Sequence, residues 1–160
     1  AQRENAMPET SNWLVHDHRK FEAALRDCEL AAGAEDWKAA VALFQAFAED
    51  LKLHMRMEDE VIYPFFRREV ADPDDDLGEL MYEHDTLVRL LNDLARVIRN
   101  RDFDHFEDSL TPLYQAMTEH NVHEESVLRR LGSDSLLSRR DEILRQLETI
   151  QPGIGRAWEF

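Results

Sequence analysis

Histidine and glutamate recur in this sequence at one fixed offset. The offset is 66 residues, and it relates two sets of three: His18, His54 and Glu58, then His84, His120 and Glu124. Imidazole nitrogens and carboxylate oxygens, without thiolates, suit iron, manganese or zinc. A single histidine on an apolar helix is most often a core or boundary residue. The same three residues repeated in one register indicate a metal site instead.

The spacing within each set predicts how the ligands converge. Residues four apart on a helix lie one turn above each other on the same face, so His54 with Glu58 can direct two ligands at one point, as can His120 with Glu124. The first histidine of each set adds a ligand from a neighbouring helix. Two glutamates between two pairs of histidines suit a dinuclear centre with bridging carboxylates. Such a centre keeps open positions at which O2, NO, peroxide or water can bind.

The elements that must position these residues are predicted to be helices. Gly and Pro number only five each, whereas Ala, Leu, Glu and Arg are plentiful. Apolar residues recur at helical spacing in four long segments and one short one. The first runs from residue 11 or 12 to about 32. The second runs from 36, through a kink or fresh turn at Pro64, to a loop at 71–76. The others run from 77 to about 100, from 102 or 104 to 131, and over 136–150.

This pattern predicts an all-α fold, an antiparallel up-down four-helix bundle with a short additional C-terminal helix packed outside it or capping one end. We expect a flexible N-terminal arm over residues 1–10, the bundle over 11–150 and a tail over 151–160. The ligand stripes are also the apolar stripes, so the bundle would bury all six polar groups. Leaving them unpaired there would cost several kcal/mol per charge, a cost that two metal ions would remove.

Composition narrows the remaining choices. Cys28 is the only cysteine, which excludes an internal disulfide and a multi-cysteine zinc or iron–sulfur site. The net charge of −15 disfavours nucleic acid and anionic membranes as partners. No run reaches the roughly 18 apolar residues of a membrane span, and the first residues carry no signal pattern. We therefore expect a cytoplasmic protein that is a monomer or a weak homodimer.

The segments that carry the repeated residues resemble the hemerythrin-like, or HHE cation-binding, family. The matching segments are DHRKF around His18, HMRMEDEVIYP from His54, EHDTL around His84, and HNVHEESVL from His120. The resemblance implies a left-handed bundle around a non-haem diiron centre with an oxo or hydroxo bridge (Fe–O–Fe or Fe–OH–Fe), with zinc or manganese as substitutes. Its ligand set, carried onto this chain, is His18 and His54 for one iron, His84 and His120 for the other, and Glu58 and Glu124 as bridges.

Two departures separate this chain from the oxygen carriers of that family. The carriers have an additional histidine one turn before the position of His84, where this chain has Leu80. They also place the second bridging carboxylate five residues after its histidine, whereas His120 and Glu124 are four apart. The resemblance therefore implies a diiron protein that binds or reacts with O2, NO or peroxide, using an electron donor that the sequence does not identify. The alternative is an iron- or oxygen-responsive sensor or iron-storage module that acts through a partner.

Four further residues are candidates for additional or outer positions. His123, at the edge of the site face, could replace the missing histidine or donate a proton. His16 is turned roughly 160° from the ligand two residues later and is expected at the surface, unless a distortion at the helix start brings it inward. Tyr63 and Tyr114 could hydrogen-bond to a metal-bound ligand, although packing is the favoured role for both.

Overall fold

The computed structural model describes residues 9–132 and 138–152, and every element within them is helical. In chain order these are α1 (Glu9–Gly33), α2 (Trp37–Met57), the π-helical turn η1 (Glu58–Ile62), α3 (Tyr63–Glu69), α4 (Asp76–Arg99), the 3-10 turn η2 (Phe103–His105), α5 (Phe106–Leu131) and α7 (Arg140–Ile150). None of the described helices combines the length and apolar character needed to cross a membrane.

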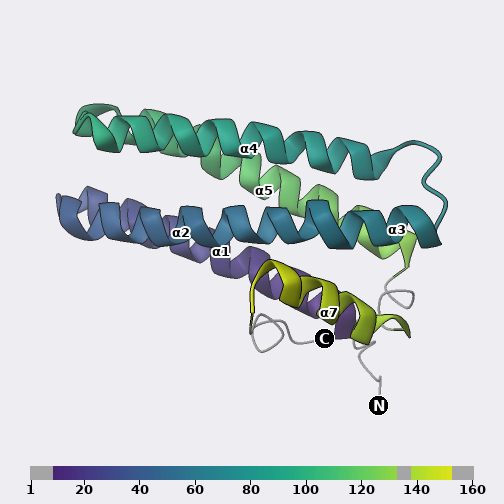
Figure 1. Ribbon diagram of the computed structural model, residues 1–160. Coiled ribbons are helices and arrows are strands. Elements are labelled where there is room, and N and C mark those ends of the chain that lie inside the picture. The colour runs from purple at the N-terminus through teal and green to yellow at the C-terminus, as the bar shows by residue number, and fades with distance from the viewer. Residues whose placement is uncertain (1–8, 133–137, 153–160) are drawn as a thin grey trace, which may run out of the picture.

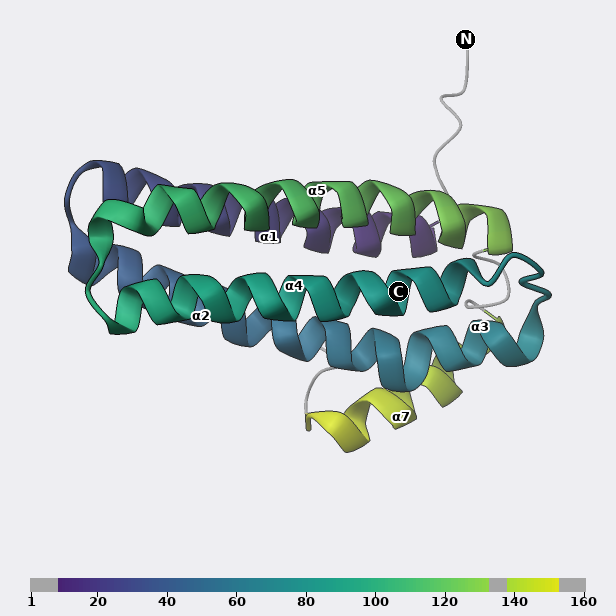
Figure 2. The same cartoon turned by 90° about the horizontal axis from the view of Figure 1, so that it is seen from above.

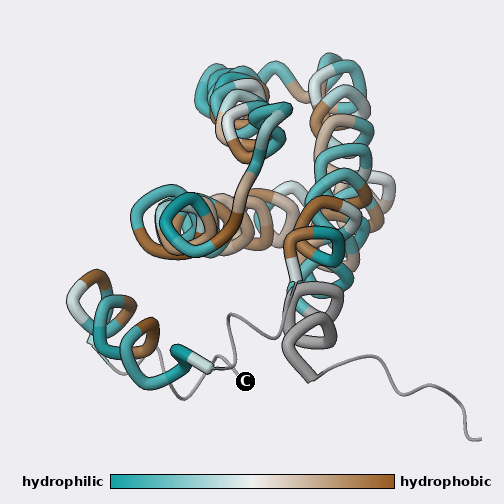
Figure 3. The backbone as a smooth tube through the Cα atoms, turned by 90° about the vertical axis from the view of Figure 1, so that its right-hand side faces the viewer, coloured by the Kyte–Doolittle hydropathy of each residue, from teal (hydrophilic) through white to brown (hydrophobic). Residues whose placement is uncertain are grey.

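Four long rods form the bundle, in agreement with the predicted fold class. α1 packs against α2 and α5, and α4 packs against α5 and α2, so each rod has two neighbours. The second rod is continuous from α2 through η1 into α3 (Figures 1 and 2). Seen end-on in Figure 3, α7 stands outside this group of four.

Several helix ends follow from local side-chain chemistry. Asp36 caps α2 by accepting a hydrogen bond from the backbone N–H of Ala39 at 3.2 Å. Asp75 caps α4 in the same way, and Gly132 ends α5 at a φ of +96°, which favours glycine. α1 begins at Glu9, two residues before residue 11, the earlier of the two predicted starts. Its first two residues therefore lie in the segment predicted to be a flexible arm. The predicted start of the last helix at 136 and most of the predicted tail lie outside the described residues.

The second rod contains a π-helical turn just before Pro64, where the sequence predicts a kink or a fresh helical turn. In η1 the N–H of Tyr63 donates to the carbonyl of Glu58, five residues earlier. Pro64 has no N–H to donate and stands in the first turn of α3. The wide turn therefore brings Tyr63 back over Glu58. The residue 66 positions later, Arg129, lies on a regular part of α5 and is exposed.

The core consists of two apolar clusters. One contains side chains from η1, α3 and the adjoining ends of α4 and α5, among them Val61, Phe65 and Leu80. The other fills the opposite part of the bundle and includes Phe21 and Leu91. Along α2, α4 and α5 the predicted ligands fall between the residues of these two clusters. A buried polar layer therefore separates the two apolar regions.

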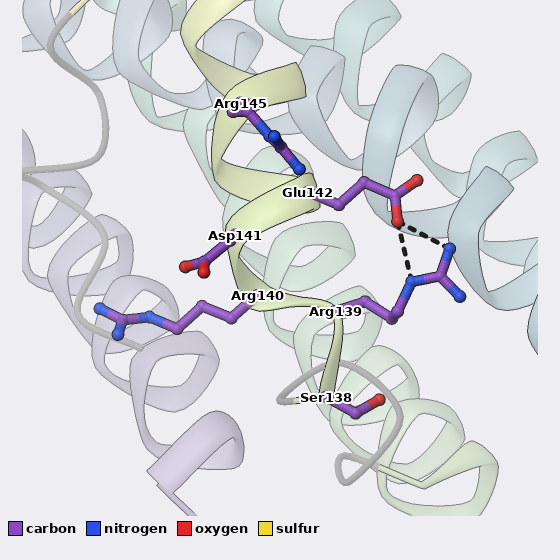
Figure 4. Close-up of a pocket in the computed structure, with 6 residues that line it drawn as sticks. All are labelled: Ser138, Arg139, Arg140, Asp141, Glu142 and Arg145. Atoms are coloured by element: carbon purple, nitrogen blue, oxygen red, sulfur yellow. Dashed lines mark hydrogen bonds and ion pairs between the residues drawn. The ribbon is translucent and has the colours of Figure 1, made fainter.

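α7 covers one end of the second rod. Its Ile143 and Leu147 are buried in the first apolar cluster, and Arg139 hydrogen-bonds to Glu69 of α3 at 3.3 Å. Figure 4 shows Arg139 also paired with Glu142 beside a pocket that is lined by the start of α7. The extra helix thus packs outside the bundle and completes its apolar end.

Candidate metal centre

The structure brings all six predicted ligands together. They come from each of the four rods: His18 from α1, His54 from α2, Glu58 from η1, His84 from α4, and His120 and Glu124 from α5. Each is between 0% and 5% exposed. Four imidazoles and two carboxylates therefore share one buried layer.

Every one of these histidines turns its Nε2 atom towards a glutamate of the layer. Nε2 of His18 lies 3.2 Å from Oε1 of Glu124, and Nε2 of His54 lies 3.2 Å from Oε1 of Glu58. Nε2 of His120 lies 3.3 Å from Oε2 of Glu124, and Nε2 of His84 lies 3.5 Å from Oε1 of Glu58. The two Nε2 atoms of His84 and His120 are 3.1 Å apart.

These donor atoms fall into two groups that could each hold a cation. In one group, donor atoms of Glu58, His84, His120 and Glu124 all lie within 4.8 Å of one another. In the other, donor atoms of His18, His54 and Glu124 meet the same limit. Glu124 belongs to both groups, as a bridging carboxylate would.

A second carboxylate holds the far side of each imidazole ring. The Nδ1 atoms pair with acidic side chains as follows: His18 with Glu125 at 3.2 Å, His54 with Asp17 at 3.4 Å, His84 with Asp59 at 2.8 Å, and His120 with Glu83 at 2.9 Å. A carboxylate at Nδ1 places the ring proton there and leaves the Nε2 lone pair for a metal. This arrangement is the usual outer support of metal-binding histidines.

The comparison with known families agrees with this geometry. The family model described as the hemerythrin HHE cation binding domain matches residues 10–131. The chain belongs to this family. No curated protein and no solved structure shows a significant match to it. The matched residues include α2 to α5 and all but the first residue of α1, whereas α7 lies outside the match.

The outer carboxylates of the HHE domain obey the same repeat as the ligands. The residues 66 positions after Asp17 and Asp59 are Glu83 and Glu125, which are also acidic. Their ion pairs with the histidines correspond in the same way, so the pair of Asp17 with His54 matches that of Glu83 with His120. Asp17, Asp59 and Glu83 are not among the site residues predicted from the sequence. From sequence alone, Glu125 is expected to be solvated or to lie outside the ligand set. Each of the four is adjacent in sequence to a ligand, so extending the offset by one residue would have found them.

The charges of the layer compensate one another when no metal is bound. Burial lowers the pKa of His54, but Glu58 and Asp17 outweigh that effect and raise the pKa to about 10. In the same way Glu124 and Glu125 raise the pKa of His18 to about 9. The pKa of His84 rises to about 10, and that of His120 also rises. The raised pKa values favour the protonated imidazoles, whose positive charge offsets that of the buried carboxylates.

Tyr63 is part of this polar layer. It is fully buried, and its hydroxyl donates to Oε2 of Glu124 and lies 3.3 Å from Oε2 of Glu58 and 3.4 Å from Nε2 of His84. Burial and the two carboxylates raise the pKa of the phenol well above its ordinary value, so it remains protonated. The ring of Tyr63 packs in the first apolar cluster, as favoured from sequence, and its hydroxyl also contacts the polar layer. For Tyr114 the favoured packing role also agrees with the structure, in which the ring packs against the second apolar cluster.

Among the described side chains, His123 and Leu80 lie outside the two donor groups. His123 is half-buried, and its Nδ1 atom pairs with Oε2 of Glu83 at 2.7 Å. His16 is in α1, but its side chain lies outside the described part of the structure. Leu80, which stands where oxygen carriers have a histidine, is fully buried in the first apolar cluster.

The donor set fits a metal of the kind that the HHE family binds. Oε1 of Glu124 is buried and has no well-aligned hydrogen bond, although Nε2 of His18 lies 3.2 Å from it. A buried carboxylate oxygen in that state costs free energy that a bound cation would return. Imidazole and carboxylate ligands with outer carboxylate supports suit iron, manganese or zinc.

Proposed function

We propose that this HHE domain holds two iron ions, one at His18 and His54 and one at His84 and His120, with Glu58 and Glu124 shared between them. The observation that carries the proposal is the convergence of four imidazole nitrogens and two carboxylates in one buried layer. The outer carboxylate on each ring supports it, since such partners orient metal-binding histidines.

We further propose that the centre binds or reacts with O2, NO or peroxide. Iron bound here would supply redox chemistry at the coordination positions that the protein does not fill. The chain contributes the surroundings: the outer carboxylates hold the rings, and Leu80 and its apolar neighbours keep water from that side of the layer. The protonated hydroxyl of Tyr63 is the one phenol donor among the described residues that contacts the layer. Because Leu80 occupies the place of the fifth histidine, we favour reaction over simple oxygen transport.

The proposal is tested by metal analysis and spectroscopy of natively purified protein. We expect two irons per chain and new charge-transfer absorption when O2 or NO is added after anaerobic reduction. His54→Ala should lower the iron content. His105→Ala is the matched control, because His105 is an exposed histidine that also pairs with a carboxylate, Asp102, at 2.7 Å. Iron-loaded protein whose spectrum is unchanged by every one of these ligands would rule out the reactive site.

The position of the layer favours one second candidate function, an iron- or oxygen-responsive sensor or storage module. The layer lies between the two apolar clusters, so its occupancy would affect the packing of both. Metal removal should then loosen the bundle, because ligands that converge in a core need the ion for stability. Equal thermal stability of metal-free and loaded protein would exclude this function.

A further inference from the structure

We propose a separate divalent-cation site on the surface where α4 meets α5, formed by Asp76, Glu79 and His123. One ligand atom from each of these residues lies within 4.8 Å of the other two. Glu79 is exposed, and the other two are half-buried, so the cluster is open to solvent. None of the three belongs to the two buried donor groups.

The orientation of His123 carries the inference. Its Nδ1 atom pairs with Oε2 of Glu83 at 2.7 Å, which places the ring proton on that nitrogen and leaves the lone pair on Nε2. Nε2 faces Oε2 of Glu79 at 3.9 Å, too far for a hydrogen bond. Two metal–ligand bonds of about 2.1 Å can span that separation. His123 therefore shows the same carboxylate support as the four buried histidines, with Nε2 directed at a different group of carboxylates.

The duplication of the domain does not account for this cluster. The residues 66 positions before its members are Thr10, Trp13 and Met57, and none of these is a carboxylate or an imidazole. At these three pairs of repeated positions, only the second copy has residues that can bind a metal. The cluster is therefore a feature separate from the repeated buried layer.

The local charges suit a cation. Asp76 and Glu79 are the acidic residues in the first turn of α4, and each offers a carboxylate oxygen to the cluster. Arg130 already pairs with Oδ2 of Asp76 and would compete with the ion for that oxygen. One imidazole and two carboxylates suit a divalent first-row transition ion, with water completing its coordination.

Glu83 connects the surface cluster to the buried layer. Its Oε1 atom lies 2.9 Å from Nδ1 of His120, while Oε2 holds His123. His123, a ligand of the proposed surface ion, is therefore joined to the buried His120 through one shared carboxylate.

The test is a titration of the full-length, metal-loaded protein with Mn2+, followed by the electron paramagnetic resonance signal of free Mn2+. We expect one Mn2+ bound weakly per chain in addition to the tightly held ions. Glu79→Gln should weaken it by at least the roughly tenfold that loss of an outer partner costs a metal site. Asp93→Asn removes the same charge about 21 Å farther along α4 and should leave the affinity unchanged. Equal weakening in both variants would overturn the proposal.

A second pair of variants tests the competition by Arg130. Arg130→Gln should tighten Mn2+ binding, because it frees Asp76. Arg99→Gln makes the same change in net charge about 35 Å away along α4, beyond the reach of screened electrostatics, and should have no effect. An unchanged affinity in Arg130→Gln would count against the site. His54→Ala should remove tight ions and keep the weak one, so failure of the proposed buried centre can be distinguished from failure of the surface site.

Discussion

The hydroxyl of Tyr63 lies 3.3 Å from Oε2 of Glu58, five residues earlier on the same rod. Residues five apart on an α-helix do not share a face, and the two meet here because η1 closes with hydrogen bonds to the fifth residue. The same hydroxyl reaches Glu124 on α5 and so links two rods inside the core. The π-helical turn thus places the hydroxyl of Tyr63 in the buried layer, where it is the one phenol among the described residues that contacts the layer.

Removal of that hydroxyl should destabilise the metal-free protein. Tyr63→Phe removes the hydroxyl that donates to the buried Glu124 and contacts Glu58, and we expect a loss of about 1.5–3 kcal/mol in the free energy of unfolding, as for a hydrogen bond to a charged group. Denaturant unfolding followed by circular dichroism measures it. Tyr114→Phe is the control, because its ring is only half-buried and packs against the second cluster. A similar loss in both variants would show that the position of the Tyr63 hydroxyl is unimportant.

Loss of an outer carboxylate should weaken metal binding. Asp59→Asn removes the anionic partner of His84, and we expect the affinity for the metal to fall roughly 10- to 100-fold. Competition with a chromophoric chelator gives the affinity. The neighbouring Glu60→Gln removes a carboxylate of the same turn that pairs with Arg56 at the surface, and it should change little. If the two variants bind metal equally well, the outer carboxylates do not support the centre.

The stability of the metal-free protein should fall in alkaline solution. Histidines whose pKa is raised on folding stabilise the folded state fully below about pH 6.5, and this contribution is lost as the pH rises through about 9 to 10. Metal-loaded protein holds these rings as neutral imidazoles, with the one proton on Nδ1, and should not show this loss. Thermal unfolding across this range, with and without a chelator, measures the difference. A constant gap between the two forms would contradict the exchange of protons for metal.

Truncation of the buried face of α7 should destabilise the domain without removing its metal. Leu147→Ala empties a fully buried position, and we expect a cost of about 2–5 kcal/mol in the free energy of unfolding. Leu30→Ala is the matched control, since Leu30 is 71% exposed. Unfolding and metal content should be measured together. An unchanged stability would mean that α7 does not complete the core, and loss of metal from a folded variant would give it a role at the site.

The sequence predicts the helices and the convergence of the six candidate ligands, because both depend on the same periodicity. A repeat of 66 residues in register fixes which face of each rod is buried, and a buried His54 with Glu58 then requires partners from the other rods. The outer carboxylates, such as Asp17 and Glu83, follow the same repeat and were within reach of sequence reasoning. The contact between Tyr63 and Glu58 was not, because one wide turn changes the face of every residue after it. Pro64 indicates only that the regular helix is interrupted.

That single wide turn also has a consequence for the symmetry of the domain. The duplication relates the two halves of the buried layer by an approximate two-fold operation, and ligands and outer carboxylates alike obey it. Tyr63 does not, because its counterpart is the exposed Arg129. The half at His84 has a phenol 3.4 Å from its ring nitrogen, and the repeat provides no such group for the half at His18. Within the described residues the two repeated positions are thereby chemically unequal, and a ligand between them would meet the hydroxyl of Tyr63 on the His84 side.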